Sequence, residues 1–299
     1  MTVAVGLAFA LDLLVGEPPA DYHPVALFGQ VVGRVERREW RAPRAAGTAV
    51  AVGFPLAAAA VVYVALSATT GFPSIVVSVL AGLVLWVSSS LRLLLEAGER
   101  VIAHSEPNPE AAREALPALV GRDPTSLSPP LIRSAAVESL AENLSDGLVA
   151  PVVAFVALSA VSLPAAAAGA AFVKAVNTLD SMLGYPGAFG WASARLDDAV
   201  MFVPARLTAV LLGPAAGDPE AAWRARRYAR TPASPNAGWP MGALAAGLNV
   251  RLEKPGTYAL NEVADLPTVA DGEDAVAVVR RAGAVTYVLS AAVGVVLWL

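Results

Sequence analysis

Residues 47–66 read GTAVAVGFPLAAAAVVYVAL, an apolar run without a single charged side chain. An α-helix rises about 1.5 Å per residue, so a run of this length matches a hydrocarbon core roughly 30 Å thick. A second apolar run, residues 72–95, follows closely and predicts a helical hairpin across a membrane. Five arginines lie in residues 34–44, directly before the first run, and the positive-inside rule places that loop in the cytoplasm.

The composition of the whole chain agrees with a membrane location. Of 299 residues, 56% are hydrophobic and 15% charged, with a mean hydropathy of +0.59, whereas about 25% of an average soluble domain is charged. The net charge of −4 and the lack of a basic block interleaved with aromatics exclude nucleic acid as a partner. The absence of cysteine excludes disulfides and zinc–thiolate sites, and leaves mainly oxygen ligands for any metal.

The other segments predict helices that are short or broken. Residues 3–15 predict a short retained helix, and residues 96–133 a polar, proline-broken cytoplasmic loop of short helices. The apolar runs 147–172 and 199–212 contain proline, so we expect broken or re-entrant helices there, and residues 283–299 predict a last span. The expected fold is an all-α polytopic membrane protein with cytoplasmic helical loops.

Four polar residues recur at four-residue spacing, Ser134, Glu138, Glu142 and Asp146. On a helix, such spacing brings the carboxylates to one face, with neighbours about 6 Å apart. Two interpretations remain open, a solvated acidic face or a set of carboxylates around a cation such as Mg²⁺. Asn143 and the position of Asp146 just before an apolar segment favour a site at the membrane surface.

A second polar face follows an alanine-rich run. Lys174, Asn177, Thr178 and Ser181 fall at i, i+3, i+4 and i+7, and Asp180 lies beside them. The lysine either extends its amine toward lipid headgroups or pairs with a phosphate while Asp180 holds a metal or accepts a proton.

Two further positions carry charge next to apolar sequence. Arg195 stands beside Asp197 and Asp198, which predicts a structural ion pair or an anion clamp with a metal ligand. Arg206 lies in an otherwise apolar stretch, where an unpaired charge costs at least about 2.5 kcal/mol, so we expect it to have a partner or a ligand. The sequence contains no GxxxxGK[ST], GxGxxG, GxSxG or HExxH motif, so a standard P-loop is excluded.

Several motifs in one order resemble the CobD/CbiB family of cobalamin biosynthesis, the adenosylcobinamide-phosphate synthases. The resemblance covers almost the whole chain and predicts one domain over residues 1–299. Its residues are LDLLVGEPP (11–19) with His23-Pro24, ESLAENLSDGLVAP (138–151), KAVNTLDSMLGY (174–185), FGWASARLDD (189–198), PARL (204–207) and SPNAGWP (234–240).

The resemblance implies a ligase in the cell membrane that uses ATP and Mg²⁺ and works on the cytoplasmic side. It would join a corrinoid, adenosylcobyric acid, to aminopropanol or aminopropanol phosphate. A homo-oligomer or a complex with other cobamide enzymes is compatible with it. Residue chemistry and motif membership together give catalytic candidates (Glu138, Glu142, Asp146, Lys174, Asp180), substrate-binding candidates (Asn143, Asn177, Arg195, Asp197, Asp198, Arg206, Asn236) and metal-ligand candidates (Glu142, Asp146, Asp180).

Two other functions fit parts of the pattern. Broken helices with charges at membrane depth are also typical of a transporter, although no internal repeat stands out. A non-catalytic scaffold would instead recruit soluble cobamide enzymes through Arg34, Arg37 and Arg38.

Overall fold

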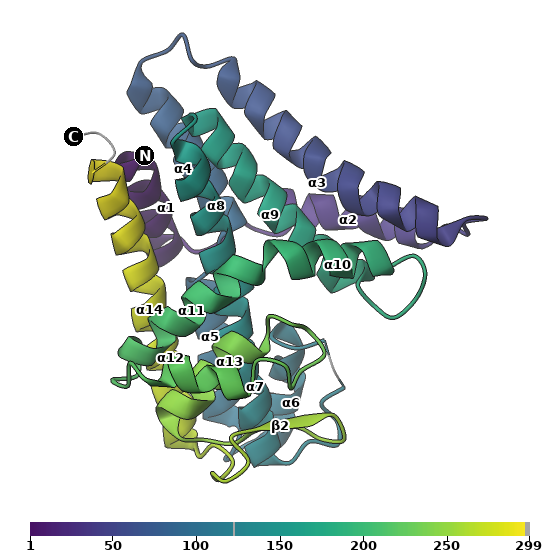
Figure 1. Cartoon of the computed structure of the whole chain (residues 1–299), viewed down its shortest axis with the longest axis vertical. Coiled ribbons are helices and arrows are strands. Elements are labelled where there is room, and N and C mark those ends of the chain that lie inside the picture. Colours follow the sequence, from purple (N-terminus) through teal and green to yellow (C-terminus); the bar gives the residue numbers. More distant parts are fainter. Residues whose placement is uncertain (122, 297–299) are drawn as a thin grey trace. The chain divides into compact units, whose positions relative to one another are not determined.

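The computed structural model describes residues 1–121 and 123–296, so the last three residues of the predicted span 283–299 lie outside the described part. Helices dominate these residues, with one small β-hairpin, which confirms the all-α membrane fold (Figure 1). The chain forms two compact units, each drawn from separate stretches of sequence. The first unit contains Met1–Ser90, Asp146–Met201 and the chain from Tyr287, and the second contains Leu91–Ser145 and Phe202–Thr286.

The first unit is a bundle in which α9 packs between α3 and α8, while α1 packs on α4 (Figure 1). Its helices are α1 (Thr2–Leu14), α2 (Pro24–Glu36), α3 (Pro43–Ser67), α4 (Ser74–Ser88), α8 (Ala150–Ser159), α9 (Leu163–Leu183), α10 (Trp191–Val200) and the end of α14 (Val269–Val296).

The second unit consists of α5 (Arg92–His104), α6 (Pro109–Ala115), α7 (Pro129–Leu144), α11 (Phe202–Ala215), α12 (Ala221–Arg224), α13 (Gly238–Leu248), strands β1 (Leu252–Lys254) and β2 (Tyr258–Leu260), and most of α14. Two 3₁₀ turns, Leu116–Ala118 and Ala225–Arg227, join helices within it, and a π-helix, Ser145–Val149, separates α7 from α8.

Among the described residues, four helical runs are long and apolar enough to cross a membrane. They are Pro43–Ser67, Ser74–His104, Pro129–Ser159 and Val269–Val296. The runs predicted at 47–66, 72–95 and 283–299 correspond to three of them. The run Pro129–Ser159 was not predicted as a span, because its carboxylates and Pro151 masked a helix that continues from α7 through the π-helix into α8.

The expected helix breaks are present. Between α8 and α9, residues 160–162 leave the helix, and the Ser162 hydroxyl caps α9 by accepting the Ala165 N–H at 3.2 Å. Met201 separates α10 from α11. One break was not expected. Ser89 has extended backbone (φ −127°, ψ 148°) and ends α4 within the predicted 72–95 helix. The Ser89 hydroxyl lies 3.0 Å from the Tyr287 hydroxyl, which satisfies polar groups at this break.

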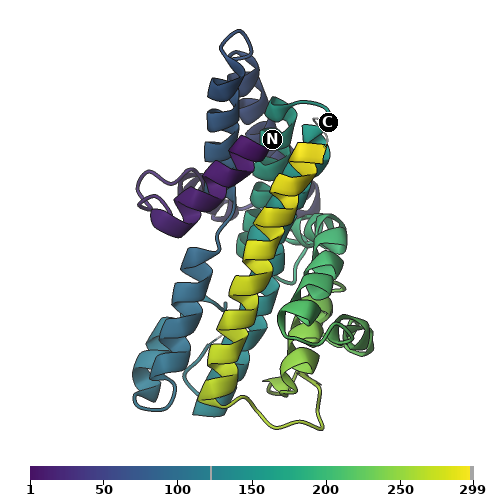
Figure 2. The ribbon, with the colours of Figure 1, turned by 90° about the vertical axis from the view of Figure 1, so that its left-hand side faces the viewer.

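The two ends of the chain meet in the first unit. Figure 2 shows α1 beside the C-terminal end of α14. The Thr2 hydroxyl donates to the Ala291 carbonyl at 3.1 Å, and the rings of Phe9 and Tyr287 stack with centroids 4.8 Å apart. The N-terminal helix is therefore an integral part of this bundle.

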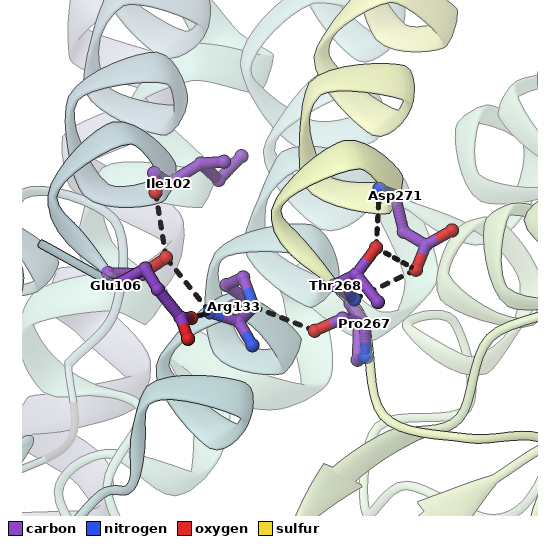
Figure 3. Close-up of polar contacts among 7 residues, drawn as sticks. Ile102, Glu106, Arg133, Pro267, Thr268 and Asp271 are labelled. Atoms are coloured by element: carbon purple, nitrogen blue, oxygen red, sulfur yellow. Dashed lines mark hydrogen bonds and ion pairs between the residues drawn. The ribbon is translucent and has the colours of Figure 1, made fainter.

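A buried arginine organises the second unit. Arg133 on α7 donates to the Pro267 carbonyl at 2.7 Å, to Glu106 at 2.7 Å and to the Ser105 hydroxyl at 3.2 Å (Figure 3). Pro267 immediately precedes Thr268, whose hydroxyl and N–H both bond the Asp271 carboxylate at the start of α14. Arg133 thereby links α7 to the residues after α5 and to the beginning of α14.

The β1–β2 hairpin is another element that the sequence did not predict. Its strands pair antiparallel, with Leu252 opposite Leu260 and Lys254 opposite Tyr258, and Gly256 at the turn has φ +71°. Three-residue strands are too short to give a recognisable alternation. The hairpin matters for the site because Tyr258 projects a hydroxyl toward α7.

Candidate active site

A rigid turn between α1 and α2 presents the first two ionisable groups of the site, Glu17 and His23. Gly16 has φ +79°, a conformation that favours glycine, and its carbonyl accepts the Trp86 indole N–H at 2.9 Å. Proline at positions 18 and 19 restricts the chain that follows. Glu17 therefore leaves the turn in a fixed direction.

His23 caps the N-terminus of α2 and is buried, 7% exposed. Its Nδ1 accepts the Val25 N–H at 3.2 Å, so the neutral ring carries its proton on Nε2. That Nε2 lies 3.6 Å from Oε2 of Glu17. Burial lowers the pKa of His23, Glu17 opposes this effect, and the nearby Lys174 ammonium adds to it.

Lys174 on α9 is the cation of this group. Burial lowers the pKa of Lys174, while the carboxylates of Glu17 and Asp146 act in the opposite direction through their charge. Asp146 comes from the π-helix Ser145–Val149, an irregularity that recurs at functional sites. Three segments distant in sequence thus bring their charges into one electrostatic cluster, which we call the Lys174 cluster (Glu17, His23, Asp146 and Lys174).

A second group of charges joins α9 to α10. Arg195 and Asp198 form an ion pair at 3.0 Å, one of the two alternatives that the sequence left open, and the arginine side chain remains 63% exposed. Burial raises the pKa of Asp180, and the negative charge of Asp198 raises it further. A carboxyl with a raised pKa is a better proton acceptor near neutral pH than an ordinary aspartate.

In the second unit, Arg206 has the partner that the sequence predicted. Its guanidinium donates to the Asn236 side-chain oxygen at 3.2 Å and to the Phe202 carbonyl at 2.5 Å. The same group lies over the rings of Phe202 and Trp239, at 3.5 and 4.9 Å from their centroids. These contacts fix a planar cation from the PARL motif next to the SPNAGWP motif.

Glu138 has structural partners. The carboxylate is 5% exposed and accepts from the Ser134 hydroxyl at 3.1 Å and the Tyr258 hydroxyl at 3.0 Å. The Ser134 oxygen in turn accepts the Glu253 N–H at 2.7 Å. These bonds attach the hairpin to α7 and favour a structural role for Glu138 over the predicted catalytic one. Asn143 likewise donates to the Ser139 carbonyl, at 3.0 Å.

The predicted site residues divide between the two units. The first unit contains Asp146, Lys174, Asn177, Asp180, Arg195, Asp197 and Asp198, and the second contains Glu138, Glu142, Asn143, Arg206 and Asn236. Within residues 1–121 and 123–296, no three histidine, aspartate or glutamate side chains are grouped so as to hold a metal ion. The candidate set omitted Glu17 and His23, although their motif, LDLLVGEPP with His23-Pro24, was visible in the sequence.

The fold and the Lys174 cluster define a class of protein before any comparison. Helices that can span a bilayer, helix breaks and buried ionisable groups together are typical of membrane proteins that act on or carry a polar ligand. Comparison with known proteins narrows the class.

The family model described as CobD/Cbib protein matches residues 5–287. A "Cobalamin biosynthesis protein CobD" of Rhodobacter capsulatus is 39% identical over 314 residues, covering 94% of this chain and 92% of the relative. The protein of the same description from Mycobacterium tuberculosis is 39% identical over 310 residues, covering 98% and 94%. A "Probable cobalamin biosynthesis protein CobD" of Methanothermobacter thermautotrophicus is 36% identical over 276 residues, covering 87% and 86%.

The chain belongs to the CobD/CbiB family of cobalamin biosynthesis proteins, as its motifs predicted. No solved structure gave a significant match, so the arrangement of its residues comes from the present structure alone.

Proposed function

We propose that this protein is an ATP-dependent amide ligase that joins adenosylcobyric acid to aminopropanol or aminopropanol phosphate. The observation that carries the proposal is the Lys174 cluster, in which residues from three family motifs meet inside a membrane-type bundle. Family membership supplies the pathway, and the charges supply the means to handle anionic substrates.

The proposed reaction has two steps. A propionate oxygen of the corrinoid attacks the γ-phosphorus of ATP, and the bond from that phosphorus to the β–γ bridging oxygen breaks. ADP departs, and the corrinoid now carries an acyl phosphate. The amine nitrogen then attacks the acyl carbon, inorganic phosphate departs with the electrons of the C–O bond, and the nitrogen loses a proton. Such transfer depends mainly on positioning and neutralisation of charge.

The residues are assigned by their surroundings. Asp180, whose pKa burial raises, is the proposed acceptor of the amine proton, and Asp146 is a second candidate. The exposed guanidinium of Arg195, which lies in the same unit as Asp180, is the proposed partner of phosphate. Lys174, a buried cation on which the charges of Glu17 and Asp146 act, is the proposed partner of a negative group of the corrinoid or the amine substrate. Asn177, Asp197 and Asp198, all in this unit, remain candidates for orienting substrate.

Magnesium is proposed to arrive with ATP as part of the substrate. Mg²⁺ in phosphate-transfer sites usually keeps several waters and takes only one or two protein carboxylates besides the phosphates. The described residues form no group of three that would hold a metal without the nucleotide. Of the predicted ligands Glu142, Asp146 and Asp180, one or two would therefore suffice.

The experiment is turnover by purified protein with adenosylcobyric acid, each amine, ATP and Mg²⁺, comparing Asp146→Asn and Asp180→Asn with the control Glu114→Gln. Glu114 is an exposed residue of α6 outside the motifs. We expect each aspartate variant to lose about a hundredfold in turnover and the control to be unaffected. The proposal fails if both aspartate variants, at normal membrane abundance, keep nearly wild-type turnover.

A further inference from the structure

An apolar cavity of about 490 Å³ lies within the first unit, between α2, α3, α4 and α9. Its walls are hydrophobic except for Ser88, Lys174 and Thr178. The volume falls within the range of about 300–1,000 Å³ that small-molecule sites occupy. A corrin ring carrying many amides would find few polar partners there, so the occupant must be largely apolar.

The cavity lies at the depth of lipid acyl chains. Arg44 is at the start of α3, and the cavity-lining residues of that helix begin at Phe54 and continue to Val62. Ten residues of helix rise about 15 Å, which is half of a hydrocarbon core of roughly 30 Å. The part of this stretch that does not line the cavity is also apolar, with Leu56 54% and Val64 66% exposed. An apolar molecule at this depth is most simply a lipid chain.

A positive segment precedes α3 at the level expected for headgroups. Residues 34–44, here called the arginine segment, contain five arginines against Glu36 and Glu39, a net charge of +3, and all five arginines are exposed. Aromatic rings accompany them, since the Arg44 guanidinium lies 4.4 Å from the Trp191 ring centroid and Trp40 stacks on Phe189. Arginines and tryptophans next to a membrane span are typical of a surface that holds anionic lipid.

Helix α2 connects the two features. Val31 lines the cavity, and Arg34 follows three residues later on the same helix, about 4.5 Å further along its axis. Leu27 and Val31 are both 45% exposed and share the face that continues to Arg34. One helix therefore offers apolar contact to a chain and positive charge to the group at its end.

We propose that the cavity binds an acyl chain of an anionic phospholipid whose headgroup the arginine segment holds. Lys174 also lines the cavity, but the arginine segment carries the larger positive charge and is the proposed partner of the headgroup. The site goes beyond the proposed ligase activity and does not depend on it.

The test measures lipid retained by the full-length protein. Protein reconstituted in phosphatidylcholine bilayers, with or without phosphatidylglycerol, is released in mild detergent, and native mass spectrometry counts the lipids that stay bound. The variants are Ala58→Phe, which fills the cavity, and Ala60→Phe, a matched control that is exposed on α3 and does not line it. A third variant, Arg34→Gln with Arg38→Gln and Arg41→Gln, weakens the headgroup contact.

We expect wild type and Ala60→Phe to retain phosphatidylglycerol in preference to phosphatidylcholine. Ala58→Phe should lose it, and the triple arginine variant should bind it about a hundredfold more weakly. If Ala58→Phe fails to fold, Ala175→Leu narrows the cavity from α9 instead. Equal retention of lipid by wild type and a folded cavity-filled variant would overturn the proposal, and so would equal retention of the two lipids. It would also be overturned if the arginine variant kept its lipid and lost a bound protein. Ligase turnover is not the readout, so a failed lipid site and a failed enzyme assignment give different results.

Discussion

Replacing Tyr258 with phenylalanine should release the β1–β2 hairpin from α7. The Tyr258 hydroxyl donates to the Glu138 carboxylate at 3.0 Å, and that carboxylate is 5% exposed. A hydrogen bond to a charged, buried acceptor contributes about 1.5–3 kcal/mol, and the variant leaves the acceptor without this donor. We therefore expect local opening of the hairpin to become easier by about 2 kcal/mol, which is roughly a 30-fold loss of amide protection.

Hydrogen exchange followed by mass spectrometry measures this directly on peptides that cover residues 252–260, in detergent or nanodiscs. Glu138→Gln should have a smaller effect, about fivefold, because the amide oxygen still accepts but the charge is lost. The double variant should cost less than the sum of the two, since both changes act on one contact. Tyr185→Phe is the matched control, because that tyrosine is 63% exposed.

Unchanged exchange of the hairpin in Tyr258→Phe would refute the reasoning. Glu138 would then not hold the hairpin on α7, and the catalytic role predicted from its spacing would again be the leading hypothesis. A loss of protection across the whole second unit, instead of the hairpin alone, would also contradict a local contact.

Three further predictions concern other buried groups. Arg133→Met should lower the unfolding free energy by about 2 kcal/mol, because the Pro267 carbonyl loses its donor, and an unchanged denaturant midpoint in detergent would contradict this. Asp180→Asn should raise the thermal midpoint at neutral pH, since the raised pKa of Asp180 means that ionisation is unfavourable in the fold; a lowered midpoint would contradict it. The pKa of His23 is lowered in the fold, so the unfolded chain binds a proton on this ring at a higher pH than the folded chain does. Stability should therefore fall as the pH drops below about 6.5. The fall should be shallower in His23→Gln when thermal midpoints are compared across pH.

The sequence predicted the membrane elements well because their signal is local. Residues 47–66 and 72–95 are long apolar runs, and the breaks near residue 161 and at Met201 follow from proline and polar residues in short segments. It missed the run Pro129–Ser159, because a π-helix lets the chain pass from a polar to an apolar helix without a turn signal. It also missed the hairpin, whose strands are shorter than any periodicity can reveal.

The sequence predicted the types of residue in the site better than it predicted which of them lie together in space. A pairing of Arg195 with Asp198 was one of two alternatives, because the two residues are neighbours in sequence. A partner or a ligand for Arg206 was expected because an unpaired charge in an apolar stretch is costly. The link between Glu138 and Tyr258 joins residues 120 apart and depends on a hairpin that the sequence did not indicate. The approach of Glu17 and Asp146 to Lys174 likewise needs the packing of α1, α8 and α9 in three dimensions.

The most direct test of the central claim is product formation by the purified protein in membranes, with adenosylcobyric acid, ATP and Mg²⁺, and with aminopropanol and aminopropanol phosphate in parallel reactions. Mass spectrometry should find adenosylcobinamide or its phosphate only when ATP and active protein are both present, with ADP formed in equal amount. Folded protein that forms no product with either amine would contradict the ligase assignment and leave a transporter or a scaffold as the function to be tested.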